Sequence, residues 1–292
     1  MNEVLTESEG DYTHQTAPTQ FVEAAGIRFA YRSFGKKAGL PLVMNMHFRG
    51  TLDHWDPAIT DGFAKEREVI IFDNIGVGST TGMTPASIYD LAKYAEAFVD
   101  ALGLKKIDLL GFSIGGLVAQ QFTLDRPELV RRLVLSGTGP RAGENMQAGT
   151  PEGKEIFSGS YASPDDDEMW IRTFFTSSEK SRVAAKEYIK RIRTRQIDRD
   201  PIVSEATATA QRAAIGAYSV ITEDRYSDLK KILQPTLVVN GSHDVIIYTI
   251  NSYILQQHLP NATLILYPDS AHGHLWQYPE QFVEHVTLFL SN

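Results

Sequence analysis

A single serine stands where an apolar run of the sequence meets a segment with helical spacing. Ser113 lies within GFSIG, residues 111–115, and apolar side chains recur every three or four residues after it. The pattern predicts a strand, a sharp turn and a helix, with the serine at the corner. A hydroxyl at such a corner is open to a substrate, and the first N–H groups of the helix face any negative charge that develops there. These residues indicate nucleophilic catalysis by serine.

Two glycines flank Ser113 at the positions that a tight turn requires. A corner of this kind strains the backbone of its central residue, and Gly111 and Gly115 carry no Cβ atom that would collide with the neighbouring turn. The G-x-S-x-G pattern is common by itself and becomes a strong indication of serine catalysis only between a strand and a helix. The alternative is a glycine-rich junction whose serine has no chemical role.

The segments around this turn alternate between short apolar runs and helical runs. The apolar runs are rich in Leu and β-branched residues, as in strands buried on both faces. They span residues 40–47, 67–74, 106–113, 130–139, 234–244 and 262–270. Helical spacing occupies residues 89–102, 115–125, 248–258 and 279–290. The alternation predicts a mostly parallel sheet with helices on both faces, preceded by an antiparallel hairpin between Thr19 and Gly35.

One long segment, residues 140–226, breaks this alternation. It contains no convincing strand, and its spacing predicts amphipathic helices over residues 169–175, 181–195 and 204–221. A helical cap over the carboxyl edge of the sheet explains such an insertion more simply than a second independent domain does. We therefore expect a core of residues 19–139 and 227–292, a cap of residues 140–226 and a flexible N-terminal arm of residues 1–18.

The composition excludes several classes of protein and of site. The chain has 292 residues, 42% hydrophobic and 22% charged, which is typical of a soluble globular protein, and no apolar run approaches the roughly 20 residues of a membrane span. A net charge of −8 without a long basic run disfavours nucleic acid as a partner. The absence of Cys excludes disulfides, thiolate ligands and a cysteine nucleophile. The acidic, polar start lacks a secretory signal, so we expect a cytoplasmic protein.

The strand order, the GFSIGG sequence of the serine turn and the position of the helical insertion resemble the α/β-hydrolase superfamily. The turn is similar to that of its esterase, lactonase and cofactor-free perhydrolase branches. The resemblance extends over nearly the whole chain from Thr19. It implies an α/β-hydrolase fold with a mostly parallel eight-stranded sheet, helices on both faces and a helical cap. In this family the nucleophile, an acid and a histidine follow one another in that order along the chain.

The resemblance assigns the acid to Asp244 and the base to His272. Asp244 ends the segment NGSHD, which matches the family's N-G-x-x-D pattern, although an Asp here is also a candidate N-cap for the next helix. His272 follows the last apolar run, where the family has D-x-G-H, with Ala271 in place of the usual Gly. His274 is the rival base, and we favour its packing against the helix that follows.

The resemblance also implies an oxyanion hole made by the backbone N–H groups of Phe48 and Ile114. Phe48 stands where the family often has Gly, but the donor is main chain and survives this substitution. Arg49 either holds a substrate carboxylate or pairs with Asp53 or Asp73, and the ion pair is the more frequent use of such a residue.

Aromatic residues of the cap and of the loop after residues 40–47 are candidates for the substrate pocket or for the cap's own core. A pocket built from them would favour a small or medium-sized hydrophobic ester or lactone. The candidate substrate-binding residues are His47, Phe48, Arg49, Trp170, Phe174, Phe175 and Tyr218.

No metal and no cofactor is expected, because the sequence offers no ligand cluster beside the serine. Residues 73–80, DNIGVGST, contain a G-x-G. They lack the third glycine and the following helix of a dinucleotide site, so we expect a structural turn instead.

The predicted reaction is acyl transfer to water, in which His272 takes the proton of Ser113 and the serine oxygen attacks an ester or lactone carbonyl. A C–C bond hydrolase or a perhydrolase with the same triad stays open, as does a ligand receptor with a vestigial triad. Serine rather than aspartate at the turn disfavours epoxide hydrolases and haloalkane dehalogenases. Either a monomer or a homodimer is compatible with the sequence.

Overall fold

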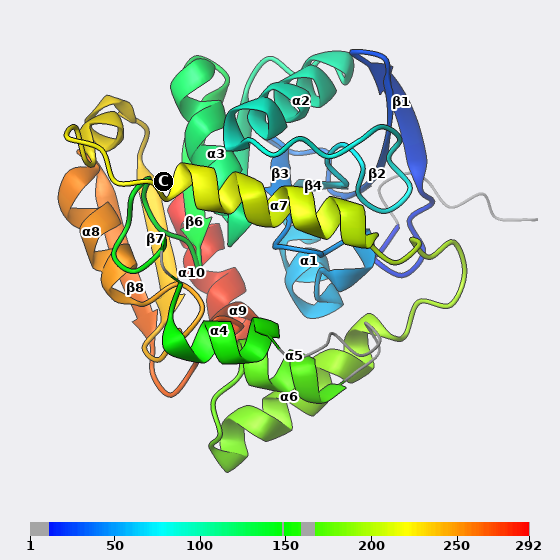
Figure 1. Cartoon of the computed structure of the whole chain (residues 1–292). Coiled ribbons are helices and arrows are strands. Elements are labelled where there is room, and N and C mark those ends of the chain that lie inside the picture. Colours follow the sequence, from blue (N-terminus) through cyan, green and yellow to red (C-terminus); the bar gives the residue numbers. More distant parts are fainter. Residues whose placement is uncertain (1–11, 148, 159–166, 292) are drawn as a thin grey trace, which may run out of the picture.

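An eight-stranded sheet runs through the computed structural model, which describes residues 12–147, 149–158 and 167–291 (Figure 1). The strands lie in the order β1-β2-β4-β3-β5-β6-β7-β8. The β1–β2 and β2–β4 pairs are antiparallel, and every other pair is parallel. The strands are β1 (Gln20–Ala24), β2 (Ile27–Gly35), β3 (Leu42–Asn45), β4 (Glu68–Phe72), β5 (Ile107–Phe112), β6 (Val130–Ser136), β7 (Thr236–Gly241) and β8 (Ala262–Tyr267). The predicted fold class and the leading hairpin are confirmed.

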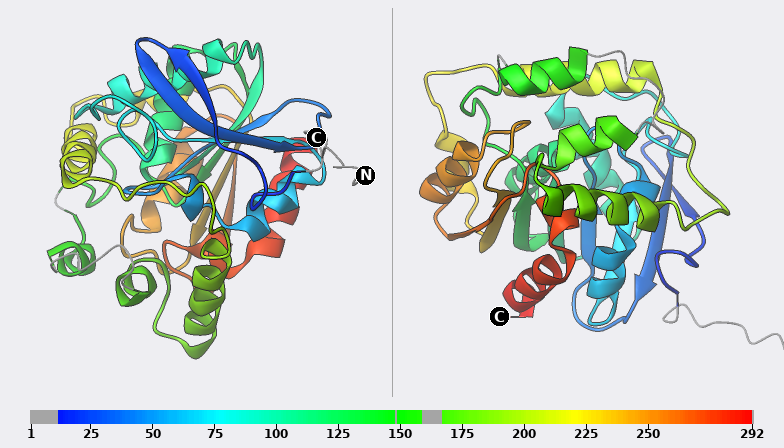
Figure 2. Two further views of the ribbon diagram at one scale, coloured as in Figure 1. Left: turned by 90° about the vertical axis from the view of Figure 1, so that its right-hand side faces the viewer. Right: turned by 90° about the horizontal axis from the view of Figure 1, so that it is seen from below.

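The helices cover both faces of the sheet, as Figure 2 shows. Because side chains alternate between the faces along a strand, Leu42 and Met44 join one cluster of buried apolar residues and Val43 joins the other. The first cluster packs under α1 (Pro57–Ala64) and α10 (Pro279–Ser291). The second packs under α2 (Ile88–Ala101), α3 (Ile114–Asp125) and α8 (Ile250–His258). No helix within the described ranges is long and apolar enough to cross a membrane.

Outside residues 140–226, four helices were not predicted from the apolar spacing: α1 and three shorter ones. Asp56 begins α1: its carboxylate accepts the N–H of Ala58 at 2.9 Å, and Pro57 occupies the first helical position. The other three contain too few turns for a periodic pattern to be recognised. They are η1 (Leu52–His54), η2 (Ser227–Lys231) and α9 (His274–Gln277).

The described part of residues 140–226 contains helices joined by turns and loops, and no strand. The helices are α4 (Pro151–Ser158), α5 (Asp167–Phe174), α6 (Glu179–Ile192) and α7 (Glu205–Tyr218), and only α4 was not predicted. Tyr188 of α6 stacks on Trp276 of α9 with ring centroids 4.0 Å apart, and Trp170 of α5 belongs to the same buried cluster. These helices therefore share a core with the sheet. In the view of Figure 1, α7 crosses in front of the strands.

The expected flexible arm of residues 1–18 is wrong for the part that the structure describes; residues 1–11 lie outside it. His14 and Ala17 are buried. The backbone N–H of His14 donates to Asp61 at 2.6 Å, and its carbonyl accepts from Arg195 at 3.1 Å. Alternation and composition gave no sign of these contacts, because each of them joins residues far apart in the chain.

We predict that His14 makes the protein less stable as the pH falls. Burial, and next the nearby Arg32 charge, lower the pKa of His14 to about 3 in the folded protein. An unfolded histidine has a pKa of about 6.5, so the unfolded chain binds a proton first and stability is lost between those two values. His14→Gln should reduce the slope of unfolding free energy against pH by about 1.4 kcal/mol per unit near pH 5.

Urea unfolding of both proteins at intervals from pH 7 to pH 4.5 measures this slope. Curves for the two proteins that run parallel over the whole range would contradict the assignment of this proton uptake to His14.

Candidate active site

Four predicted site residues follow the carboxyl ends of four parallel strands. Phe48 lies after β3, Ser113 after β5, Asp244 after β7 and His272 after β8. The carboxyl ends of parallel strands meet at one edge of a sheet, so residues up to 224 positions apart in the chain come together there.

Ser113, His272 and Asp244 form one hydrogen-bonded series. His272 Nε2 lies 2.9 Å from Ser113 Oγ, and His272 Nδ1 lies 2.8 Å from Asp244 Oδ2. All three side chains are buried. Because a carboxylate only accepts, Nδ1 carries the ring proton and Nε2 is left to accept the proton of the serine hydroxyl. This is the geometry that a general base and its nucleophile require.

The backbone at Ser113 is strained, with φ 58° and ψ −122°. Neighbouring groups hold it in place. Its N–H donates to the carbonyl of Ser136 at 2.9 Å, and its carbonyl accepts from Thr138 Oγ1 at 2.9 Å and from the N–H of Gly116 at 2.8 Å. A conformation of this kind costs about 1–3 kcal/mol and persists only where its surroundings fix it.

The two glycines of the pentapeptide permit two close backbone contacts. A Cβ at Gly111 would lie 2.3 Å from the carbonyl oxygen of Gly115, within the first turn of α3. A Cβ at Gly115 would lie 2.2 Å from the carbonyl oxygen of Asn45, at the end of β3. These glycines therefore bring the start of α3 against both the serine turn and the loop that follows β3.

Asp244 is held by the backbone as well as by His272. Its Oδ1 accepts the N–H groups of Ile246 at 2.9 Å and Ile247 at 3.0 Å, while Oδ2 faces the imidazole. The cap-like role and the orienting role that the sequence suggested for this aspartate thus use different oxygens. A carboxylate with both oxygens occupied is fixed in direction.

Two aromatic rings lie beside the His272 imidazole. The ring centroid of Phe112, from β5, is 5.1 Å away, and that of Phe174, from α5, is 5.6 Å away and nearly parallel. The carbonyl of Phe174 also accepts the N–H of Gly273 at 2.7 Å. The cap helix α5 therefore fixes the histidine loop through both a ring and a main-chain group.

His274, the rival base, makes its hydrogen bonds to groups other than Ser113. Its Nε2 lies 2.9 Å from Ser136 Oγ, and its Nδ1 donates to the carbonyl of His272 at 3.1 Å. Burial lowers the pKa of His274 to about 3, so the ring is neutral near pH 7. It supports the main chain of His272 in this position.

The predicted oxyanion loop has one residue with a left-handed backbone and one buried imidazole. Arg49 has a left-handed backbone, with φ 61°. Burial, and next His54, hold the pKa of His47 well below its usual value, so the neutral ring donates from Nδ1 to the carbonyl of Phe48 at 2.8 Å. Phe48 lines the same pocket as Ser113, and Ile114 begins α3, where the first N–H groups have no acceptor within the helix. The role of these two N–H groups stays a prediction.

The pocket beside Ser113 is small and largely apolar, with a volume of about 60 Å³. Four predicted substrate contacts lie in its wall together with Phe48, and Met169, Thr173 and Ile246 were not predicted. The lining residues are His47, Phe48, Arg49, Ser113, Met169, Trp170, Thr173, Phe174, Ile246 and His272.

Two predicted aromatic contacts and the predicted partners of Arg49 need correction. Tyr218, at the end of α7, lines a different pocket beside α3, and the guanidinium of Arg141 lies 5.4 Å from its ring. Phe175 faces Tyr188 of α6, with centroids 6.1 Å apart. Neither residue lines the pocket beside Ser113.

Arg49 pairs with Glu205 of α7, and not with Asp53 or Asp73. Asp53 is occupied by Arg32 at 2.7 Å, and Asp73 accepts the N–H of Leu52 at 3.0 Å. Among the described residues, no group of three or more Asp, Glu and His side chains is arranged to hold a metal ion.

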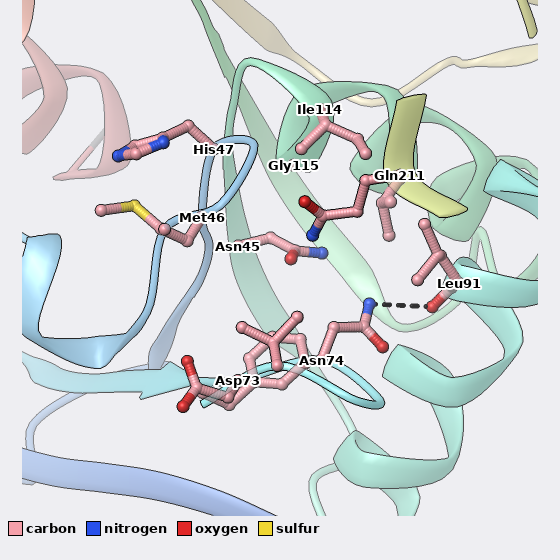
Figure 3. Close-up of a pocket in the computed structure, with 13 residues that line it drawn as sticks. Asn45, Met46, His47, Asp73, Asn74, Leu91, Ile114, Gly115 and Gln211 are labelled. Carbon is pink, nitrogen blue, oxygen red and sulfur yellow. Dashed lines mark hydrogen bonds between the residues drawn. The ribbon is translucent and has the colours of Figure 1, made fainter. Parts of the chain in front are cut away.

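A second, smaller cavity of about 20 Å³ lies behind the loop that follows β3 (Figure 3). Its volume corresponds to about one water molecule. Amide side chains of Asn45, Asn74 and Gln211 line it, together with Ile114 and Gly115 of the serine turn. Gln211 comes from α7, so this cavity joins the cap to the predicted oxyanion loop. No pattern in the sequence indicated this cavity.

Comparisons with known proteins agree with this architecture. The profile of a family described as alpha/beta hydrolase fold matches residues 39–279. A poly(3-hydroxyalkanoate) depolymerase of Ectopseudomonas oleovorans is 33% identical over 86% of this chain and 83% of its own length. A pimeloyl-[acyl-carrier protein] methyl ester esterase of Nitrosomonas europaea is 30% identical over 66% of this chain and 74% of its own. A solved structure, an alpha/beta hydrolase fold protein from Chitinophaga pinensis, is 38% identical with a TM-score of 0.90, over 96% of this chain and 100% of that one.

We predict that Gly115→Ala destabilises the protein by about 3 kcal/mol, because the added methyl group collides with the backbone of β3 and must push α3 away. Gly216→Ala is the matched control. Its Cβ would meet nothing within 4 Å in the exposed part of α7, so it should stabilise the helix by about 0.5–1 kcal/mol. Urea unfolding at pH 7 measures both changes. A loss below about 1 kcal/mol for Gly115→Ala would contradict the close contact.

Proposed function

The chain belongs to the α/β-hydrolase fold family, and from this membership we propose that it is a serine hydrolase that cleaves small carboxylic esters or lactones. The observation that carries the proposal is the buried series from Ser113 through His272 to Asp244 beside an apolar pocket. A nucleophile, its base and an orienting carboxylate in hydrogen-bond contact are what acyl transfer requires.

The reaction begins when Ser113 Oγ attacks the carbonyl carbon and His272 Nε2 takes the hydroxyl proton. Asp244 stabilises the imidazolium that results. The N–H groups of Phe48 and Ile114 stabilise the negative charge on the former carbonyl oxygen. The imidazolium then gives its proton to the leaving alcohol oxygen, and an acyl-serine remains. Water, deprotonated by His272, repeats the attack and releases the acid.

Two observations support an ester or lactone as the substrate. The pimeloyl methyl ester esterase is 30% identical over 66% of this chain, and its name states ester cleavage. The pocket next to Ser113 is lined mainly by apolar side chains and has a volume of about 60 Å³. Such a volume holds a group of a few heavy atoms, which favours a short apolar acyl chain.

Labelling with a fluorophosphonate and hydrolysis of p-nitrophenyl esters test the nucleophile and the base. We expect one adduct, located by mass spectrometry on Ser113, and none on Ser113→Ala. His272→Ala should lower kcat/KM by about 10⁴-fold or more, because the base is lost. His274→Ala should lower kcat/KM by no more than about 10-fold, because it removes only a supporting hydrogen bond.

Three outcomes would contradict the proposal in different ways. A greater loss in His274→Ala than in His272→Ala would show that His272 is not the base. An adduct on another residue would show that Ser113 is not the nucleophile. Tight ligand binding without adduct or multiple turnover would favour a receptor.

The pocket makes a separate prediction about chain length. Met169 lines the pocket, so Met169→Ala enlarges it and should raise the kcat/KM of the octanoate ester relative to the butyrate ester by about 10-fold. Met83→Ala is the matched control, since Met83 is 88% exposed and lies outside the pocket. An unchanged ratio in Met169→Ala would show that the acyl chain binds elsewhere.

A further inference from the structure

The peptide group between Phe48 and Arg49 is held from both sides. Its carbonyl accepts from Nδ1 of His47 at 2.8 Å, and its N–H donates to Oε1 of Gln211 at 3.0 Å. This peptide group directly follows the N–H of Phe48, one of the two proposed oxyanion donors. The orientation of a peptide plane and that of the preceding N–H are coupled through the two backbone dihedrals of one residue.

Gln211 belongs to the cap, and 162 positions separate it from Arg49 in the sequence. Its side chain is buried, with 5% of the residue exposed. Figure 3 shows it reaching from α7 into the small cavity behind the β3 loop, beside Ile114 and Asn45. The amide therefore acts where little water is available to replace its hydrogen bond.

Two further residues of α7 contact the same two loop residues. Glu205 pairs with the side chain of Arg49. The guanidinium of Arg212 lies 5.7 Å from the centre of the Phe48 ring. Three side chains from one helix thus converge on a two-residue segment whose second residue has a left-handed backbone. Such a backbone persists in a residue other than glycine only where its surroundings hold it.

We propose that Gln211 is a positioning residue for the oxyanion hole: its amide oxygen fixes the Phe48–Arg49 peptide group so that the N–H of Phe48 points at the reacting carbonyl. The inference rests on the proposed serine hydrolase activity. Oxyanion donors act through accurate placement, and a displaced donor loses most of its effect on the transition state. Gln211 touches no substrate atom in this scheme. It makes transition-state stabilisation depend on the position of α7.

The test compares esters with thionoesters of the same acid and alcohol. A thionoester places sulfur, a weak hydrogen-bond acceptor, where the ester places the developing oxyanion, so its hydrolysis gains little from the hole. Gln211→Met keeps the length of the side chain and removes the amide oxygen. We expect kcat for the ester to fall by about 10-fold or more, with KM changed by less than about 3-fold. The thionoester should lose less than about 3-fold, so the ester preference shrinks.

Ala213→Ser is the matched control, a change at an exposed position on the same helix that should leave both rates and the ester preference unchanged. If Gln211→Met does not fold, as judged by thermal unfolding, Gln211→Ala is measured in its place. Equal losses on ester and thionoester, or no loss on either, would overturn the inference while the wild-type activity still supports the proposed function. A wild-type protein that neither hydrolyses the ester nor reacts with a fluorophosphonate at Ser113 contradicts the proposed function, and the inference falls with it.

Discussion

The contact between α3 and the end of β3 is the constraint on which the rest of the structure depends. With no Cβ at Gly115, the first turn of α3 lies directly against the carbonyl groups of Asn45 and Met46. Ser113 must then turn sharply between β5 and α3, which produces its strained backbone. The same contact brings the start of α3 beside the loop after β3. One close approach of two main chains thus sets the nucleophile and both proposed oxyanion donors in a single geometry.

A buried ion pair joins the cap to the sheet and so fixes where α7 begins. Arg32 of β2 donates to Asp53 at 2.7 Å and to the carbonyl of Asp198 at 2.9 Å, and Asp53 accepts the N–H of Asp200 at 2.7 Å. Burial alone would raise the pKa of Asp53, yet the Arg32 charge and these hydrogen bonds hold it below its usual value. An ion pair of this kind adds little net stability but strongly disfavours arrangements that separate its partners. The segment before α7 therefore has one position on the core.

The sequence predicted what short-range patterns encode and missed what distant contacts decide. Strands buried on both faces have an apolar signature, and G-x-S-x-G at a strand end marks a turn, so the sheet and Ser113 were predicted directly. The acid and the base followed from the resemblance. Gln211 was missed because one amide on an amphipathic helix gives no sign of which loop it faces. Tyr218 was misplaced for the same reason, since an aromatic residue at a helix end can pack on either neighbour.

Some residues of the cap only line the pocket, and others also contact the residues around Ser113. Met169 and Thr173 line the apolar pocket, and neither makes a hydrogen bond to the series at Ser113, so substitutions there change the volume of the pocket and leave those hydrogen bonds in place. Phe174 lines the same pocket but also stacks on His272. Gln211 lies outside that pocket and holds the loop after β3. For the proposed hydrolase, a change of substrate is therefore least costly to catalysis at cap positions that face the pocket and contact neither the His272 loop nor the loop after β3.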